Sequence, residues 1–566
     1  MWNTYWTDRG EPWDYDPGPP QTGGWAELFA QTPHYRLIGK QRLGREAFRW
    51  HFGPMFYRGR LAPNAVKVLL IGQEGAQDES LAHRSFAGGS GSKMQNFLRW
   101  IGISRSYLFL NTFVYPIYGQ YVQDLKWLAQ NDASPIAQHR HQLFEHLAAT
   151  NSLQLVVSVG AAAKEAVATW RRMRGGNLPA GVQAIHVLHP GAAAAGSASA
   201  VRASFVRAAN QIGKWVKDNP SWLPKDADAA RHFDEPFKFR DAPIPFRDLP
   251  FGITWRLGHG GTSSNRRDNQ EAIQLFSVDG KYNNTGQPVS YSGSAAGSKE
   301  GYDDDPGDLP YEPPKIAFDQ FDQGPGEALA TLLMGGEPGL DWPDFEALGM
   351  PCHPSFGYGP ILRGRPGNAS LVVLADQDSH DDLFTARAHT GDGGQRFQKF
   401  LAAAGLTKSY AILRVLPVNT RGATDAKLRA AIDHPQVQKL YREILARVQS
   451  SRALLAIGPW SRRLAAAVGP AGLQRLEMKS VLESGWQADW QQALQTLSTL
   501  TYPRDQSASF SYDGSRGQIA RIDLPYGTLR WQATSGDRAL QAMRSGQPSR
   551  DYFKLDMPKW AAALTV

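Results

Sequence analysis

Cysteine is almost absent from this chain of 566 residues, in which Cys352 is the only one. A single cysteine cannot form a disulfide within the chain, and it cannot supply an all-cysteine metal site or iron–sulfur cluster. We therefore expect no disulfide framework, no metal and no other cofactor.

Long apolar runs and a targeting signal are also missing. No stretch of about 18 apolar residues occurs, and residues 1–20 do not show a basic segment followed by an apolar one. These absences predict a cytoplasmic protein without a membrane span. Apolar residues make up 42% of the chain, and the length predicts two or three domains. The net charge of +8 permits a polyanionic partner but does not demonstrate one.

Apolar strands alternate with amphipathic helices between residues 25 and 216. The pattern predicts strands at 66–71, 107–114, 153–160 and 182–189, and helices at 93–102, 136–149, 161–173 and 200–216. Such alternation is typical of an α/β fold, here a three-layer αβα arrangement around a central parallel sheet. Ligands bind at the carboxyl ends of strands in these sheets. The segment GQEGAQDESLAHRSFAGGSG (72–91) follows directly after the first predicted strand.

The second half of the chain repeats this pattern. Residues 371–417 align without a gap with residues 68–114, at an offset of 375 − 72 = 303 and, again, 414 − 111 = 303. RGR at 58–60 recurs at 363–365, and DLP at 248–250 recurs at 523–525. We interpret the chain as an internal duplication, in which each α/β domain is followed by a β-rich appendage. The expected segments are an irregular arm (1–24), an active α/β domain (25–216), a β-rich appendage with linker (217–350), a second α/β domain (351–500) and a C-terminal β-rich appendage (501–566).

The two copies differ in the polar residues at their strand ends. Glu74, Phe86 and Asn111 in the first copy correspond to Gln377, His389 and Arg414 in the second. HPG at 189–191 follows the fourth strand of the first copy, where the second copy has LEMKS (476–480). We therefore expect the first copy to be active and the second to be a degenerate partner. HPS at 353–355 precedes the second RGR, and we interpret it as loop punctuation.

Three carboxylates follow the first predicted strand: Glu74, Asp78 and Glu79. A carboxylate at a strand end can orient or deprotonate a water, or stabilise a cationic sugar-like transition state. The same residues would also suit the N-terminus of a helix, where the macrodipole favours negative charge. The pattern alone does not separate these two interpretations.

Phe86 stands beside the glycine-rich turn AGGSGS (87–92). It could stack on a planar base, which contributes roughly 1–3 kcal/mol, or it could belong to the core. The turn opens a helix, so its backbone N–H groups could hold a phosphate, and Lys93 would add positive charge. The bland alternative is that the glycines form only a turn.

Two further polar residues lie after strands. Asn111 ends the strand LFLN and is either a cap or a reader of a base edge, because its amide offers both a donor and an acceptor. His189 either begins a helix or donates a hydrogen bond to a leaving base oxygen or a phosphate.

The order of these features resembles the uracil-DNA glycosylase superfamily. The similarity is to the bacterial and archaeal branch whose first motif runs Gly-Glu-Ala-Pro-Gly, followed by Glu-Asp and Arg-Pro-Phe-x-Gly. RSFAGGSG (84–91) keeps the Arg, the Phe and both Gly positions. LFLN (108–111) resembles the strand-end asparagine motif of the classical uracil enzymes, and LHPG (188–191) resembles the superfamily's His-Pro-Ser motif. The resemblance covers about 60–216 well, and 365–500 only as a frame.

The resemblance implies a DNA glycosylase that flips a base and hydrolyses its N-glycosidic bond to leave an abasic site. It assigns the water-activating position to Glu74, base stacking to Phe86, base-edge binding to Asn111 and leaving-group assistance to His189. The catalytic candidates are Glu74, Asp78, Glu79 and His189. The base-binding candidates are Gln73, Gly75, Ala76, Phe86 and Asn111. The candidates for gripping the DNA are Gly88, Gly89, Ser90, Gly91, Ser92, Lys93, Pro190, Gly191 and Arg202.

Several departures from the family pattern bear on the substrate. Gly75 replaces the motif's Pro, the iron–sulfur cysteines of the similar branch are missing, and the loop at 191–200 has no Leu or Arg wedge. Arg202 or the second copy would then fill the gap left by a flipped base. The small residues Gly75 and Ala76 favour a modified or hypermodified pyrimidine, which in phage DNA would make this a defence enzyme. The alternatives are a uracil-DNA glycosylase of base-excision repair and a non-catalytic sensor of DNA or nucleotides. We expect the protein to bind DNA as a monomer.

Overall fold

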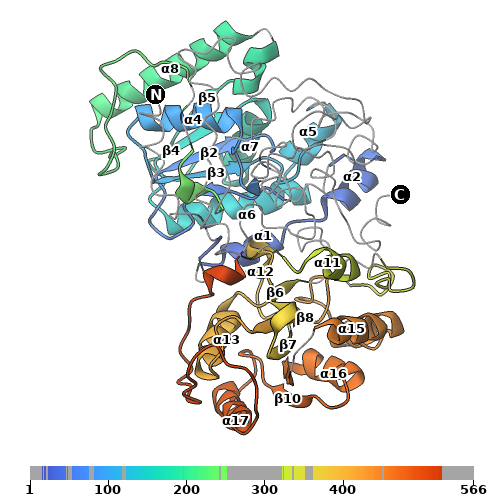
Figure 1. Ribbon diagram of the computed structural model, residues 1–566. Helices are drawn as coiled ribbons and strands as arrows, with labels where there is room; N and C mark the ends of the chain where they lie inside the picture. The colour runs from blue at the N-terminus through green and yellow to red at the C-terminus, as the bar shows by residue number, and fades with distance from the viewer. Residues whose placement is uncertain are drawn as a thin grey trace. The chain divides into compact units, whose positions relative to one another are not determined.

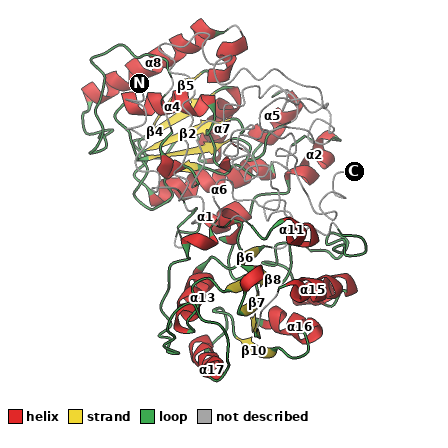
Figure 2. Ribbon diagram, viewed as in Figure 1, coloured by secondary structure: helices red, strands yellow, loops and turns green. Residues whose placement is uncertain are grey.

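The computed structural model describes residues 16–250 and 322–524, apart from short gaps at 17, 21–22, 46, 49–53, 76–78, 80–81, 118–120, 122, 196, 241, 243, 323, 334–336, 351–360 and 449–451. The chain divides into two compact units, of which residues 16–250 belong to the first and residues 322–524 to the second. Each unit contains its own sheet, flanked by helices (Figures 1 and 2). Among the described residues, no helix is long and apolar enough to cross a membrane.

The first unit is built on a five-stranded sheet in the order β1-β3-β2-β4-β5. The strands are β1 (Arg58–Gly59), β2 (Val68–Gly72), β3 (Tyr107–Asn111), β4 (Leu155–Val159) and β5 (Gln183–Val187). Strands β2 to β5 run parallel, as the sequence predicts, whereas β1 pairs antiparallel with β3 at one edge. Every residue of β2, β3 and β4 is buried, because helices cover both faces of the sheet.

Two groups of helices cover this sheet. Helices α4 (Gly89–Trp100) and α8 (Ala198–Asp218) pack on one face and share a hydrophobic core with alternate residues of β2, β3 and β4. Helices α5 (Gln123–Gln130), α6 (Pro135–Thr150) and α7 (Ala161–Met173) contact one another and cover the other face. The three-layer αβα prediction is therefore confirmed. The predicted helices correspond to α4, α6, α7 and α8, while α1 (Trp25–Ala30), α2 (Tyr35–Leu43) and α5 were not predicted.

The second unit has the same strand order. Its strands β6 (Leu362–Gly364), β7 (Leu371–Ala375), β8 (Tyr410–Arg414), β9 (Ala453–Ile457) and β10 (Gln474–Met478) lie in the order β6-β8-β7-β9-β10. The final residues of the two central strands pair alike, Gly72 with Asn111 and Ala375 with Arg414. The longer helices are α13 (Asp392–Ala403), α14 (Asp425–Ile432), α15 (Pro435–Arg447), α16 (Pro459–Val468) and α17 (Trp486–Ser498), with short helices α11 (Glu327–Leu333) and α12 (Asp382–Thr385).

The appendages are not β-rich where the structure describes them. Residues 219–250 and 499–524 contain only irregular chain and the short 3-10 helices η4 (Phe246–Asp248) and η9 (Arg521–Asp523). In the first, Asp226 accepts hydrogen bonds from the backbone N–H groups of Ser104, Arg105 and Ser106 at 2.7–3.0 Å. In the second, Asp505 holds residues 407–409 in the same way. These segments pack through side chains that bind backbone groups, so they need no strand pairing.

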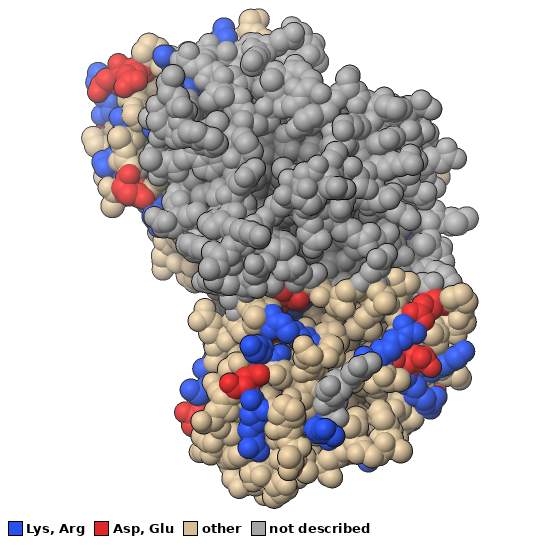
Figure 3. All heavy atoms as spheres, in the orientation of Figure 1, with Lys and Arg blue, Asp and Glu red and all other residues tan. Residues whose placement is uncertain are grey.

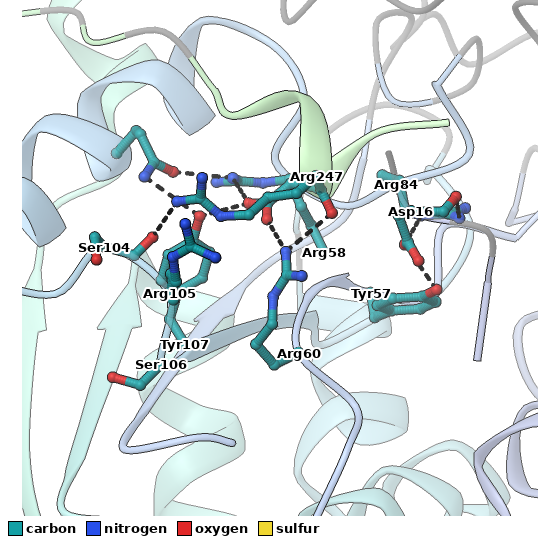
Figure 4. A network of polar contacts seen from close by, with 12 residues as sticks. Asp16, Tyr57, Arg58, Arg60, Arg84, Ser104, Arg105, Ser106, Tyr107 and Arg247 are labelled. Carbon is teal, nitrogen blue, oxygen red and sulfur yellow. Dashed lines mark hydrogen bonds and ion pairs between the residues drawn. The ribbon is translucent and has the colours of Figure 1, made fainter. Parts of the chain in front are cut away.

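In each unit, the recurring RGR and DLP motifs meet in a buried ion pair, and Figure 4 shows the one in the first unit. Arg58 Nη1 donates to Asp248 Oδ2 at 2.7 Å, and the hydroxyl of Tyr107 donates to the same oxygen at 2.6 Å. Arg60 also pairs with Asp248. In the second unit, Arg363 pairs with Asp523 at 3.1 Å. The motifs recur because, in each unit, they supply the two halves of the ion pair that holds the segment after the last strand against the edge of the sheet.

A second set of contacts involves the segment that precedes the first strand of each unit. Asp16 Oδ2 accepts from Arg84 Nε at 2.7 Å and from Tyr57 at 2.8 Å, and the Asp16 N–H donates to the carbonyl of Leu249. The second unit repeats this arrangement: Asp322 accepts from Arg387 at 2.6 Å and donates to the Leu524 carbonyl. The sequence offered a sign of these contacts that was not used in the prediction: the similar motifs DPG (16–18) and DQG (322–324). They join segments on both sides of the predicted boundaries at 24/25 and 216/217.

Asp248 and Asp523 are equivalent buried carboxyls, and comparing them tests how much each ion pair contributes to stability. Burial alone would raise the pKa of Asp248, but Arg60, Arg58 and Arg247 outweigh it and hold the pKa below its ordinary value. At Asp523, burial outweighs Arg363 and the pKa is raised. We expect Asp248→Asn to lower the free energy of unfolding by about 3–5 kcal/mol, because it leaves buried arginines unpaired. Asp523→Asn should cost less.

Chemical denaturation of the full chain at several pH values checks this expectation. Because the folded pKa of Asp248 is depressed, its contribution is present above the unfolded pKa and is lost as the pH falls through the folded pKa. Wild type and Asp248→Asn should therefore converge in acid. Equal costs for the two substitutions at neutral pH would contradict the assignment.

Candidate active site

The carboxyl ends of the parallel strands bring the predicted site residues to one edge of the first sheet. Gly72 ends β2 and pairs with Asn111 at the end of β3, while Gly160 and His189 follow β4 and β5. Neighbouring strands lie about 4.8 Å apart. Two strand spacings, from β3 across β2 to β4, therefore separate Asn111 from the end of β4 by about 10 Å. This width is sufficient for one planar base.

Phe86 and Asn111 converge on the space above Gly72. A Cβ atom at position 72 would lie 2.4 Å from Phe86 Cζ and 2.5 Å from Asn111 Oδ1, far closer than real contacts. The glycine is therefore required for the ring and the amide to sit over the end of β2. The sequence did not predict this role for Gly72.

The Asn111 amide is buried, and the structure gives a hydrogen-bond partner for its nitrogen but none for its oxygen. The side chain is 5% exposed, and its Nδ2 donates to Ser85 Oγ at 3.4 Å. Its Oδ1 is buried and has no hydrogen-bond partner among the described residues. An unpaired buried polar atom costs about 1–3 kcal/mol. A ligand that offers an N–H donor at this position would remove that cost.

Phe86 combines a strained backbone with a packed ring. Its φ is +55°, a left-handed value that costs an L-residue about 1–2 kcal/mol. The ring packs against Phe109 with centroids 4.9 Å apart, and the residue is 6% exposed. His389 has a φ of +56° at the equivalent position. The kink thus belongs to the scaffold of both units, whereas the phenyl ring is specific to the first, because the second has an imidazole there.

The start of α4 is shaped by close packing against this kink. A Cβ at Gly91 would lie 1.7 Å from the Phe86 carbonyl oxygen, and one at Gly394 would lie 1.6 Å from that of His389. Gly91 is therefore needed for packing in its own right. Gly88 precedes the helix and donates its N–H to Glu79 Oε1 at 3.0 Å.

The acidic cluster divides between two locations. Gln73 and Glu74 are partly exposed at the end of β2, where Glu74 can face a bound ligand. Glu79 is buried and holds the glycine turn through Gly88, as Asp382 does in the second unit through the N–H groups of His389 and Thr390. This contact suits Glu79 to positioning the turn. Gly75 is buried beside them, while Ala76 and Asp78 lie outside the described residues.

The residues predicted to grip DNA are unequally accessible. Gly89 and Ser90 are partly exposed at the first turn of α4. Ser92 is fully buried and donates from Oγ to the Gly89 carbonyl at 2.8 Å. Lys93 is 1% exposed, so its ammonium group is not presented at the surface. Backbone groups at the start of α4 are therefore better placed to meet a phosphate than Lys93.

His189 lies over the end of β4 and has a defined ring orientation. Its Nδ1 accepts from the Gly191 N–H at 3.1 Å, which places the proton of the neutral ring on Nε2. A Cβ on Gly160 would lie 3.2 Å from the His189 Cβ, so this glycine admits the histidine. Pro190 begins η3 (Pro190–Ala195), which contacts both α4 and α8, the helix that carries the partly buried Arg202. The histidine loop and the glycine turn therefore border the same edge.

The corresponding edge of the second unit has different chemistry. The Arg414 side chain turns back to donate to the carbonyls of Leu416 and Val418, at 2.9 and 3.1 Å. Gln377 Oε1 accepts from the Thr420 N–H at 2.8 Å. Ala375 stands in place of Gly72, so a methyl group occupies the position that the Phe86 ring and the Asn111 amide cover in the first unit. The second unit therefore has polar residues at this edge too, but Arg414 and Gln377 bind groups of their own unit.

The described residues contain no group of three or more His, Cys, Asp or Glu side chains arranged to hold a metal ion.

Substitution of Gly72 tests whether the ring and the amide share its space. We expect Gly72→Ala to displace Phe86 or Asn111 and to cost about 1–3 kcal/mol of stability, as overpacked sites do. Gly367→Ala is the matched control, because no atom lies within 4 Å of its added Cβ. Thermal unfolding measures the cost, and a Gly72→Ala protein as stable as the control would refute the convergence.

Comparison with known protein families gives a match to the part of the chain that contains this edge. A family model described as the uracil DNA glycosylase superfamily matches residues 59–229, which include Gly72, Phe86, Asn111 and His189. No curated protein matches the chain significantly. Residues 59–229 therefore form a domain of the uracil DNA glycosylase superfamily.

Proposed function

We propose that the first unit is a DNA glycosylase that flips a pyrimidine out of DNA and hydrolyses its N-glycosidic bond. The superfamily domain suggests this activity and implies DNA binding. The observation that carries the proposal is the buried, unpartnered Oδ1 of Asn111 beside the Phe86 ring. This pair offers an acceptor for a base edge together with an aromatic surface for the base.

The base would bind against the two side chains that cover Gly72, with its edge at Asn111 and its plane against Phe86. Extrusion of a nucleotide costs a few kcal/mol of unstacking and unpairing. Stacking on an aromatic ring returns roughly 1–3 kcal/mol. The start of α4 borders this space, and the N-terminus of a helix suits a flanking phosphate because its first backbone N–H groups have no partner within the helix.

Glu74 and His189 would divide the chemistry between them. As the N-glycosidic bond stretches, positive charge develops on the sugar and negative charge on the departing base. His189 would donate from Nε2 to a base oxygen, since its Nδ1 is occupied by Gly191. Glu74 would hold the water that attacks C1′, and its negative charge would stabilise the oxocarbenium-like sugar.

The identity of the base is proposed from the sequence around Gly75. The small residue at Gly75 suggests room for a larger pyrimidine, yet a Cβ there would lie 2.1 Å from Met55 Sδ. Met55 thus fills the volume that the missing side chain leaves. A modified or hypermodified pyrimidine, and with it a role against phage, stays a hypothesis drawn from the departures in sequence, and uracil is the alternative.

The second unit is proposed to be non-catalytic. It lacks the Gly72, Phe86 and Asn111 combination, and the buried Arg414 takes the place of the amide. On the face shown in Figure 3, the basic side chains of residues 322–524 stand among acidic ones. Ion pairs of this unit include Arg447 with Glu337. The described part of this face offers no extended basic track for DNA.

The activity is tested by incubating the full chain with DNA that contains uracil and scoring abasic sites. We expect Asn111→Ala and His189→Gln each to reduce the rate by about 10²–10³, the usual loss when one transition-state hydrogen bond is removed. Glu74→Gln should lower turnover with little change in DNA affinity. Gln377→Glu, the reciprocal change in the second unit, serves as control and should leave the rate unaltered.

A panel of substrates separates the candidate functions. Release of modified pyrimidines from phage DNA faster than uracil would support the modified-base hypothesis, and cleavage of uracil alone would exclude it. Tight DNA binding without release of any base would instead indicate a sensor.

A further inference from the structure

Ser85 links the Asn111 amide to a fixed backbone carbonyl. The Ser85 hydroxyl donates to the Met55 carbonyl oxygen at 2.8 Å. A hydroxyl has one proton, so toward Asn111 the Ser85 oxygen can only accept. It does so from Nδ2 at 3.4 Å. The amide nitrogen must therefore face Ser85, which turns Oδ1 toward the space above Gly72.

The position of Ser85 is itself held firmly. The residue is fully buried, its N–H donates to the Tyr57 carbonyl at 3.0 Å, and its carbonyl accepts from Arg58 Nε at 3.2 Å. Rotation of the Asn111 amide by 180° would place its oxygen against the Ser85 oxygen, with no donor between them. The alternative amide orientation is thus disfavoured on a rigid support.

The second unit shows that the Ser85 hydroxyl is not needed for the fold of this turn. Its counterpart is Ala388, whose carbonyl still accepts from Arg363 Nε at 2.9 Å. Where the hydroxyl is missing, the asparagine is also replaced, by Arg414. The hydroxyl and the amide are present together in one unit and absent together in the other.

We propose that Ser85 is a positioning residue that sets base specificity by fixing the orientation of the Asn111 amide. The fixed Oδ1 accepts from an N–H donor on the ring, and the second Nδ2 hydrogen can donate to a neighbouring carbonyl. This pattern matches a 4-keto pyrimidine, with its N3–H and O4. A 4-amino pyrimidine presents the opposite pattern and is rejected. The inference rests on the proposed function and narrows its substrate class.

The test measures discrimination in binding, so that it does not depend on turnover. Two single-stranded oligonucleotides carry one central 2′-fluoro-arabino uridine or cytidine, whose glycosidic bonds resist cleavage. Their dissociation constants are measured for the full-length wild type, Ser85→Ala and Ser85→Thr. We expect the wild type to favour the uridine strand, Ser85→Ala to reduce that preference at least tenfold, and Ser85→Thr to retain it because the hydroxyl is kept.

The outcomes separate this inference from the proposed function. An unchanged preference in Ser85→Ala, or a wild type that favours cytidine, would overturn the role of Ser85. Absence of abasic sites with every substrate would overturn the glycosylase proposal, while the binding preference could still be scored. Ala388 indicates that Ser85→Ala will fold, and thermal unfolding of both variants confirms that the comparison is between folded proteins. If Ser85→Ala does not fold, loss of the preference in Ser85→Thr would count against the proposal.

Discussion

The buried ion pair between Arg58 and Asp248 is the contact on which the rest of the first unit depends. It joins the edge strand β1 to the short helix η4, and Arg58 also binds Gln95 of α4 and the carbonyl of Ser85. One guanidinium thus connects the sheet, the helix and the turn before the site. Because breaking such a pair leaves an uncompensated buried charge, these elements are held in one arrangement.

The sequence predicted the sheet and its covering helices because apolar periodicity reports burial directly. It also predicted Asn111 and His189, which lie at strand ends, and Phe86 in the turn before α4. It could not show that Glu79 holds the glycine turn, that Lys93 is buried, or that Gly72 makes room for the ring, because these follow from three-dimensional packing. The appendages were predicted as β-rich from turn residues, whereas side chains such as Asp226 hold them in place of strand pairing.

The two units show how one scaffold carries two different strand edges. The positive φ at Phe86 and His389, and the close approach of Gly91 and Gly394, are common to both. The groups that could face a ligand are not. Since the backbone kink is kept without the phenyl ring, its strain is sustained by packing and does not by itself mark an active site. Chemistry is set by which side chains stand on the shared frame.

The hydrogen bonds of Asp16 with Leu249, and of Asp322 with Leu524, bring together the segment before the first strand and the segment after the last strand of each sheet. A module whose entry and exit points adjoin can be spliced into a longer chain, or joined end to end with another, without reaching across its own sheet. The architecture therefore lends itself to gaining or losing whole modules, and to circular permutation, with the internal packing of each left undisturbed.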